Sequence, residues 1–149
     1  METWGSKEAY QELKQYNINT NIVTEDWVVN HYKWIVWKIA SMIRTENSLY
    51  EEYWNKEKII EQLLFRYNKE NNLRKHSALK LIIEKDNIST KYMVLCVSNI
   101  IKNTEIKNDN DDENPKEPEI YLELTDGWYS INAQIDNILQ DAVKNKKFL

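Results

Sequence analysis

Residues 25–43, EDWVVNHYKWIVWKIASMI, carry the clearest alternation of hydrophobic and polar positions in the chain. Aliphatic residues recur at a spacing of about 100° per residue, the period of an amphipathic helix. A second stripe on the same helix combines tryptophan, histidine and lysine. The pattern predicts a helix that packs through an aliphatic face of Val28, Tyr32, Ile35, Val36, Ile39 and Ile43, with Trp27, His31, Trp34, Lys38 and Ser41 on the second stripe and Trp37 beside Asn30, Lys33 and Arg44.

The three tryptophans of this helix allow two interpretations. Tryptophan is usually mostly buried, so all three can belong to the core. Tryptophan is also enriched at binding hot spots, so the Trp and Lys side can present a binding surface. His31 lies on the same stripe, and we expect it to be a hydrogen-bonded packing residue.

Three further helices are predicted in the first part of the chain. Residues 6–16 begin with Ser6 as a candidate N-cap and carry acidic residues in the first turn. Asn55 precedes the amphipathic run 56–67, and another helix is expected from about 73 to 86. Thr24 is the natural N-cap of the tryptophan helix, while residues 45–54 are ambiguous.

The hydrophobic period changes after residue 90. Residues 91–101 are β-branched and apolar without helical spacing, which predicts a strand. Two further strand-like runs, IYLELT and WYSINAQI, flank Asp126-Gly127, a strong hairpin signal. Asp136 precedes a final amphipathic helix. Residues 103–119 are acidic, contain both prolines and predict a solvated loop.

This order of elements predicts an α+β fold with two domains. The first is an all-α helical domain over residues 1–88. The second, over residues 91–149, is a partial, three-stranded OB-fold β-barrel with the acidic loop at 103–119. An OB fold has five strands, and three strands leave open edges. We therefore expect either a piece of a longer protein or another chain that covers the missing edge.

Charge is distributed unevenly along the chain. Residues 1–91 contain 14 Lys and Arg against 13 Asp and Glu, whereas residues 92–149 contain 6 against 11. Neither half is as basic as a dedicated nucleic-acid-binding domain. Cys96 is the single cysteine, so no internal disulfide can form. It lies in the apolar run MVLCV, where we expect a small buried hydrophobic residue rather than a reactive thiol.

Candidate catalytic chemistry is sparse. His31 and His76 are the only histidines, so a Ser/His/Asp or Cys/His set would have to be assembled from them and Cys96, and no such set stands out. Metal binding would need more His or Cys at ligand spacing. The sequence has no Gly-rich phosphate loop, no signal-peptide pattern and no apolar run long enough for a membrane span. We expect an intracellular protein that is not an enzyme and has no catalytic residues, metal or cofactor.

Five segments together resemble the DNA-binding region of the breast cancer type 2 susceptibility protein family. They are WVVNHYKWIVWKIASM (27–42), QLLFRYNKE (62–70), SALKLIIEKD (77–86), VLCVSNII (94–101) and ELTDGWYSINAQID (123–136). They follow the family's order, with its helical domain before the start of its first OB domain. The resemblance covers almost the whole chain, and the tryptophan helix and the LTDGWY hairpin are its most specific parts.

The resemblance implies a nuclear, non-enzymatic protein of homologous recombination and double-strand break repair. In this family the helical domain and the first OB domain serve mainly as a docking platform for a small, very acidic partner that is also found in the proteasome lid. The resemblance implies that single-stranded DNA is bound weakly here or through later OB domains. A RecA-type recombinase would be bound through regions that are not in this sequence.

Basic and aromatic residues supply a surface that an acidic partner would suit. Carboxylates of an extended peptide would pair with Lys and Arg, and its rings would enter apolar pockets. The alternative is a solvated helical face balanced by Glu57, Glu61, Glu70 and Glu84. The predicted partner-binding residues are Lys33, Trp34, Trp37, Lys38, Arg66, Arg74 and Lys75.

The rival function is direct binding of single-stranded DNA through the OB face. Trp128 and Tyr129 follow the hairpin turn and, in a strand, point to opposite faces. OB domains stack bases on exposed strand aromatics, so either ring is a candidate. The alternative is that one ring fills the half-barrel core while the other packs on the helical domain.

Overall fold

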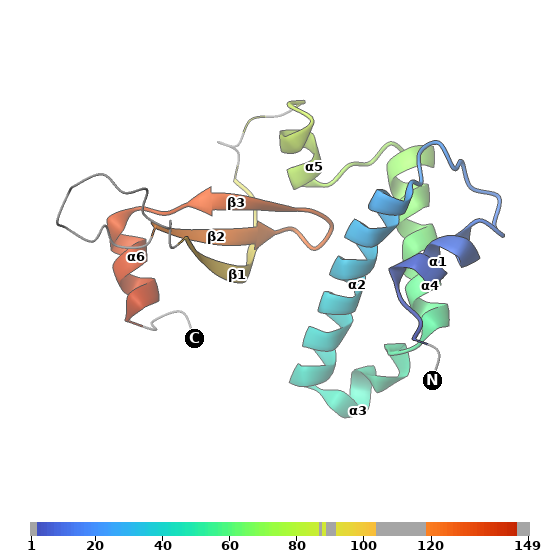
Figure 1. The fold of residues 1–149 in the computed structure, drawn as a ribbon, viewed down its shortest axis with the longest axis horizontal. Coiled ribbons are helices and arrows are strands. Elements are labelled where there is room, and N and C mark those ends of the chain that lie inside the picture. The colour runs from blue at the N-terminus through green and yellow to red at the C-terminus, as the bar shows by residue number, and fades with distance from the viewer. Residues whose placement is uncertain (1–2, 87, 89–91, 104–118, 146–149) are drawn as a thin grey trace, which may run out of the picture. The chain divides into compact units, whose positions relative to one another are not determined.

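The computed structural model describes residues 3–86, 88, 92–103 and 119–145. The chain forms two compact units, which are described separately (Figure 1). The helical unit comprises Met1–Met93 together with Asp126–Tyr129, and the sheet unit comprises Val94–Thr125 with Ser130–Leu149. The four-residue segment Asp126–Tyr129 therefore belongs to the helical unit although the strands on either side of it belong to the sheet unit.

The helical unit is built around one long helix. Its elements are α1 (Ser6–Leu13), α2 (Glu25–Thr45), α3 (Asn47–Tyr50), the 3₁₀ turn η1 (Glu51–Tyr53), α4 (Lys56–Tyr67), the π-helical turn η2 (Asn68–Asn72) and α5 (Ala78–Ile83). Helix α2 contacts α1, α3 and α4, and α1 also contacts α4. The buried hydrophobic cluster of this unit consists of Ala9, Leu13, Val23, Val28, Ile35, Ile39, Ile59, Ile60 and Leu63.

Local sequence explains why α2 begins and packs as it does. The side chain of Thr24 accepts a hydrogen bond from the backbone N–H of Trp27, at 3.2 Å, which caps the helix as predicted. Acidic residues fill the first turn and Arg44 lies in the last, in keeping with the helix dipole. Val28, Ile35 and Ile39 are buried, so the predicted packing face is confirmed.

Two helix boundaries differ from the prediction. Helix α1 is capped by Gly5 rather than Ser6 and ends at Leu13 instead of continuing to residue 16. Helix α5 is much shorter than the expected 73–86, because Arg74 adopts a left-handed backbone (φ 49°) and Ser77 caps a new helix start. The predicted cap of α4 is confirmed, since Asn55 accepts from the N–H of Lys58 at 2.8 Å.

The sheet unit contains three antiparallel strands in the order β1-β2-β3. They are β1 (Cys96–Asn103), β2 (Glu119–Thr125) and β3 (Ser130–Gln134), and helix α6 (Asn137–Lys144) follows. The side chain of Asp136 caps α6 by accepting from the N–H of Leu139, as predicted. The buried core of this unit is small: Ile120, Leu122 and Ile135, with Leu124 and Val143 packed against it.

Three expectations for this part of the chain were wrong in detail. Strand β1 begins at Cys96 rather than at residue 91. Trp128 and Tyr129 precede β3 instead of forming its start, because the connection has four residues, with Thr125 paired to Ser130. Cys96 is exposed rather than buried, since the core forms around Ile120 and Leu122 and does not reach the beginning of β1. Most of the predicted acidic loop, residues 104–118, lies outside the described residues.

The predicted α+β class is confirmed. Helices come first, and the three strands found in the described residues form an open sheet that does not close into a barrel.

Candidate partner-binding site

The seven predicted partner-binding residues divide between the surface and the interior of the helical unit. Lys33, Lys38, Arg74 and Lys75 are exposed and Trp37 is half-buried. Trp34 has 0% of its surface exposed and Arg66 has 3%. Trp34 and Arg66 are therefore too deeply buried to contact a partner directly. Each packs beneath residues that lie nearer the surface.

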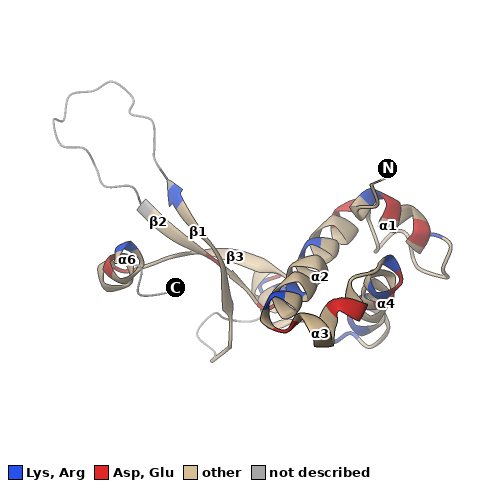
Figure 2. Cartoon of the chain, turned by 90° about the horizontal axis from the view of Figure 1, so that it is seen from below, with Lys and Arg blue, Asp and Glu red and all other residues tan. Residues whose placement is uncertain are grey.

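Helix α2 presents an aromatic and basic surface, which we call the α2 stripe: Lys33, Trp37, Lys38 and Arg44. The ring of Trp37 packs edge-on against the buried ring of Trp34, with centroids 5.7 Å apart. The Nζ atom of Lys33 lies 4.4 Å from the Trp34 ring centroid. The sequence from residue 27 to residue 45 contains no Asp or Glu, and its charged positions are Lys and Arg, drawn in blue along α2 in Figure 2.

Beneath the surface, a buried carboxylate joins three parts of the helical unit. Glu70 is only 2% exposed and lies in η2. It accepts hydrogen bonds from the Trp27 indole N–H (3.0 Å), the Tyr129 hydroxyl (2.9 Å) and the Lys80 ammonium (3.1 Å). These donors come from α2, from the Asp126–Tyr129 turn and from α5, so one side chain holds together segments that are far apart in sequence.

The protonation state of His31 follows from its two neighbours. The guanidinium of Arg66 lies 3.1 Å from Nδ1 of His31, and an arginine can only donate, so Nδ1 must accept. His31 is then a neutral imidazole whose proton is on Nε2. This Nε2–H donates to the Tyr129 hydroxyl, 3.2 Å away, and Tyr129 in turn donates to Glu70. The chain of donors runs from Arg66 through His31 and Tyr129 to Glu70.

Burial and these partners shift the pKa values of the network. Burial lowers the pKa of His31, and the nearby Arg66 charge lowers it further while Glu70 opposes both. Burial alone would raise the pKa of Glu70, but its polar contacts with His31, Trp27 and Tyr129 outweigh that effect and lower it to about 2. Burial lowers the pKa of Arg66 to about 10. At neutral pH the network therefore contains an ionised Glu70, a charged Arg66 and a neutral His31.

The Asp126–Tyr129 turn is ordered by its first residue. One carboxylate oxygen of Asp126 accepts from the backbone N–H groups of Trp128 and Tyr129, both at 3.0 Å. The other accepts from the N–H of Leu79 in α5, at 3.0 Å. Gly127 has φ 85°, a backbone conformation that favours glycine. The Asp-Gly pair thus fixes both the shape of the turn and its attachment to α5.

Both rings after the turn contact the helical unit, which corrects the expectation that one of them fills the half-barrel core. Trp128 lies 4.8 Å from the Arg66 guanidinium and 6.4 Å from the Phe65 ring centroid. Its backbone carbonyl accepts from the Asn30 side chain at 2.9 Å. Tyr129 is bound through its hydroxyl to Glu70, and burial raises its pKa. Both rings are partly buried, and the Tyr129 hydroxyl belongs to the network.

A cavity of about 350 Å³ opens beside Trp128, and we call it the Phe65–Trp128 cavity. Phe65 is 48% exposed, and the Nζ atom of Lys69 lies 5.4 Å from its ring centroid. The buried Nδ1 of His76 has no hydrogen-bond partner in the described part of the chain. Aromatic walls with basic residues suit an anionic ligand that carries an apolar group. Its lining residues are Phe65, Lys69, Lys75, His76, Ser77, Ala78, Asp126 and Trp128.

The structure brings only some of the predicted residues together. Lys33, Trp34 and Trp37 are joined by ring contacts on α2, whereas Arg66 contacts the first half of α2 through His31. Lys75 lines the cavity, and Arg74 is the exposed left-handed residue that precedes it.

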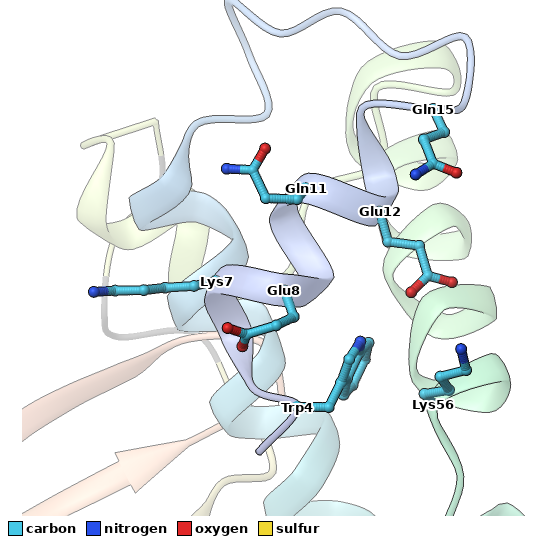
Figure 3. Close-up of a pocket in the computed structure, with 7 residues that line it drawn as sticks. All are labelled: Trp4, Lys7, Glu8, Gln11, Glu12, Gln15 and Lys56. Carbon is cyan, nitrogen blue, oxygen red and sulfur yellow. The ribbon is translucent and has the colours of Figure 1, made fainter. Parts of the chain in front are cut away.

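A second cavity, of about 540 Å³, lies beside α1 (Figure 3). Figure 3 shows Trp4, Lys7, Glu8, Gln11, Glu12 and Gln15 around it, with Lys56 from the start of α4 on the other side. The Glu8 carboxylate already accepts from the N–H of Gly5 at 2.8 Å. Its lining mixes both signs of charge and contains none of the predicted site residues.

Sequence reasoning missed the central role of Glu70. It stands in the polar run NKENN, where nothing distinguishes a buried acid from a solvated one. The available signal was indirect, since a histidine and a tryptophan on a largely apolar helix both need hydrogen-bond partners when buried. The expectation that His31 is a hydrogen-bonded packing residue is confirmed.

Among the described residues, no three His, Cys, Asp or Glu side chains gather as metal ligands would. None of their helices is both long and apolar enough to cross a membrane.

Comparison with known protein families gives two adjoining matches. Residues 2–72 match the family model described as "BRCA2, helical". Residues 77–149 match the model described as "BRCA2, oligonucleotide/oligosaccharide-binding, domain 1". The two matches adjoin in chain order and together cover nearly the whole sequence. They agree with the predicted helical domain followed by a partial OB fold.

Two curated relatives from Arabidopsis thaliana are similar to this chain. Protein BREAST CANCER SUSCEPTIBILITY 2 homolog A is 34% identical over 138 residues, and homolog B is 33% identical over 136 residues. Each alignment covers 91% of this chain but only 12% of the relative. The chain thus spans about an eighth of the length of these relatives.

Proposed function

Because this chain belongs to the BRCA2 family, we propose that it is a non-enzymatic, nuclear part of a DNA-repair protein of homologous recombination. Within that role, its helical unit docks a small acidic partner protein of the kind that also occurs in the proteasome lid. We propose residues 1–88 as its helical domain and residues 91–149 as its incomplete OB domain. Contact with a RecA-type recombinase is left to other regions of such a protein.

One observation carries the docking proposal. The α2 stripe places a half-buried tryptophan between exposed lysines, on a helix without acidic residues from 27 to 45. Trp37 rests on the buried Trp34 ring, so its orientation is fixed before a partner arrives. A preorganised aromatic anchor flanked by cations suits an acidic peptide, since the anchor supplies most of the affinity and the charges supply orientation and rate.

The Phe65–Trp128 cavity supports the same partner chemistry. Lys69 and Lys75 can pair with carboxylates at its rim, while Phe65 and Trp128 can hold an apolar side chain. The buried network beneath fixes the Trp128 backbone through Asn30 and its ring beside Arg66. Arg74 and Lys75 therefore stay in the proposed site as contacts, and Arg66 as a support.

The second candidate is single-stranded DNA binding. Trp128 beside Lys75 would suit a stacked base and its phosphate. The OB face offers less support, because Tyr121 is the one aromatic residue in β1, β2 and β3, and Glu123 follows it two positions later in the same strand. We therefore rank DNA binding by this chain below docking of the acidic partner.

Titrating an acidic peptide and oligo-dT against the same preparation of the chain distinguishes the two functions. Trp37→Ala should weaken binding of the acidic peptide by about 30-fold, as for a hot-spot ring, and added salt should weaken it further. The double variant Lys33→Gln with Lys38→Gln removes two charges from the α2 stripe. Its matched control is Lys7→Gln with Lys56→Gln, which removes two charges outside the stripe. Micromolar binding of oligo-dT that is lost with Trp128→Ala and unaffected by Trp37→Ala would reverse the ranking.

A further inference from the structure

The segment that follows α2 carries a second, oppositely charged aromatic surface. Residues 46–55, ENSLYEEYWN, contain three glutamates, two tyrosines and a tryptophan, and no Lys or Arg. They form α3 and η1, which belong to the helical unit. Neither the α2 stripe nor the Phe65–Trp128 cavity includes any of them.

The apolar side chains of this segment are unusually exposed. Leu49 is 54% exposed, Trp54 is 52% exposed and Tyr53 is 39% exposed. The rings of Tyr50 and Tyr53 lie next to each other, with centroids 6.3 Å apart and planes tilted by 53°. None of these residues is part of the hydrophobic core cluster. The exposed Tyr53 and Trp54 rings, with the partly buried Tyr50 ring beside Tyr53, are typical of an interaction surface.

The backbone holds the tryptophan in place. The N–H of Trp54 donates to the carbonyl of Glu51, and the N–H of Asn55 donates to the carbonyl of Tyr53, both at 3.0 Å. The side chain of Asn55 donates to the carbonyl of Glu52 at 2.6 Å and also caps α4. The 3₁₀ turn is therefore anchored to the start of α4, and its aromatic residues are displayed from a fixed backbone.

The charges around these rings define the partner. Glu46, Glu51 and Glu52 are exposed, and in the described residues none of them forms an ion pair. Carboxylates beside exposed tyrosine and tryptophan faces are the groups that bind ammonium and guanidinium ions, through charge pairing and cation–π contact. The same carboxylates repel nucleic-acid phosphates.

We propose that residues 46–54 are a docking surface for a basic peptide segment, in which Lys or Arg side chains contact Tyr50, Tyr53 and Trp54 and pair with Glu51 and Glu52. This surface is separate from the α2 stripe and takes a partner of the opposite charge. The chain then joins an acidic partner on one surface and a basic one on another.

The experiment measures fluorescence anisotropy of a short labelled peptide in which Lys and Arg alternate with Ser around one Leu, titrated with the 149-residue chain. A second peptide has Glu at every basic position. Trp54→Ala should weaken binding of the basic peptide by about 30-fold, and Trp54→Phe should recover part of the loss. Glu51→Gln with Glu52→Gln should weaken it by about fivefold or more and reduce its salt dependence.

Matched controls separate docking from net charge and from misfolding. Glu61→Gln with Asp141→Asn removes two exposed carboxylates elsewhere and should leave binding within about twofold of the parent, since exposed charges act weakly at a distance. All variants should unfold at the parent's temperature because the changed side chains are exposed. The acidic-peptide titration should be unaffected by Trp54→Ala, which keeps this proposal distinguishable from the one above.

Three outcomes would overturn the proposal. They are equal binding of the Glu-containing peptide, no effect of Trp54→Ala on binding of the basic peptide, and an equal loss in the charge control.

Discussion

The helical unit and the sheet unit differ in how completely each buries its own side chains. The helical unit surrounds α2 with a hydrophobic cluster drawn from three helices and the segment before α2, and it adds the Glu70 network. The sheet unit has Ile120, Leu122 and Ile135 as its buried hydrophobic core, with Leu124 and Val143 partly buried against it. Since burial supplies most of the stabilising free energy, the helical unit should resist local unfolding much more than the sheet unit.

The largest expected effect comes from removing the buried charge at the centre of the network. Glu70→Ala removes the carboxylate that accepts hydrogen bonds from Lys80, Trp27 and the Tyr129 hydroxyl. Breaking a buried charged pair in this way should lower the free energy of unfolding by about 3–5 kcal/mol. Urea titration followed by tryptophan fluorescence measures this loss.

The control for that prediction is Glu61→Ala. Glu61 is exposed and forms a surface ion pair with Lys58 at 2.8 Å, so its loss should cost less than about 1 kcal/mol. If Glu70→Ala costs no more than this control, the network does not stabilise the helical unit.

A pair of equal truncations compares the two cores directly. Leu63 in α4 is 0% exposed and Leu122 in β2 is 8% exposed. Leu63→Ala should cost about 2–5 kcal/mol, because a surrounded cavity cannot collapse. Leu122→Ala should cost less than half as much, since its small cluster can relax. Amide hydrogen exchange in α2 and in β2 measures the stability of each unit separately. Equal losses of stability from the two substitutions would contradict the proposed difference between the units.

Acid should weaken the helical unit in a defined pH window. The pKa of Glu70 is lowered to about 2 in the folded chain from its ordinary value of 4.5. Its ionised form therefore stabilises the fold above pH 4.5, and this contribution is lost as pH falls toward 2. The lowered pKa of His31 acts in the same direction, because the unfolded chain takes up its proton first as pH falls below about 6.5.

We expect the Glu70 contribution to be about 3 kcal/mol. Unfolding midpoints measured in urea from pH 7 to pH 3 should fall steeply for the parent and less steeply for Glu70→Gln. Parallel pH profiles for the two proteins would show that other carboxylates control acid unfolding.

The smallest expected effect is that of shortening the acidic segment between β1 and β2. The paired strand ends Asn103 and Glu119 are opposite each other in the antiparallel ladder. Replacing residues 105–117 with a short Gly-Ser turn should change the free energy of unfolding by less than about 1 kcal/mol, because loop closure depends only on the logarithm of length. Thermal unfolding measures it, and a large loss would show that this segment packs against the sheet unit or binds something that stabilises it.

Features that depend on a few neighbouring residues could be predicted from the sequence. Thr24, Asn55 and Asp136 were identified as N-caps because a cap needs only its own side chain and the N–H three residues ahead. The packing face of α2 followed from periodicity in the same way. The early end of α1 and the late start of α5 were not predicted, since they depend on where single residues such as Arg74 leave the helical backbone.

The candidate site could be predicted only in part, because its supports come from distant segments. The sequence placed Trp34 and Trp37 on the same side of α2, and burial of one beneath the other depends on the packing of the whole unit. The pattern of its own helix predicts that Arg66 is an exposed charge, yet its hydrogen-bond partners are His31 and the carbonyl of Gly127. No local pattern connects residues separated by 35 and 61 positions.

The membership of Asp126–Tyr129 in the helical unit has a consequence for synthesis of the chain. Ribosomes add about 5–20 residues per second and domains generally fold as units during synthesis. Helices α1 to α5 leave the ribosome well before Tyr129, whose hydroxyl contacts His31 and Glu70. Until that turn emerges, the nascent helical unit holds a buried carboxylate and a buried guanidinium without their last partners, so its final folding step waits for the hairpin.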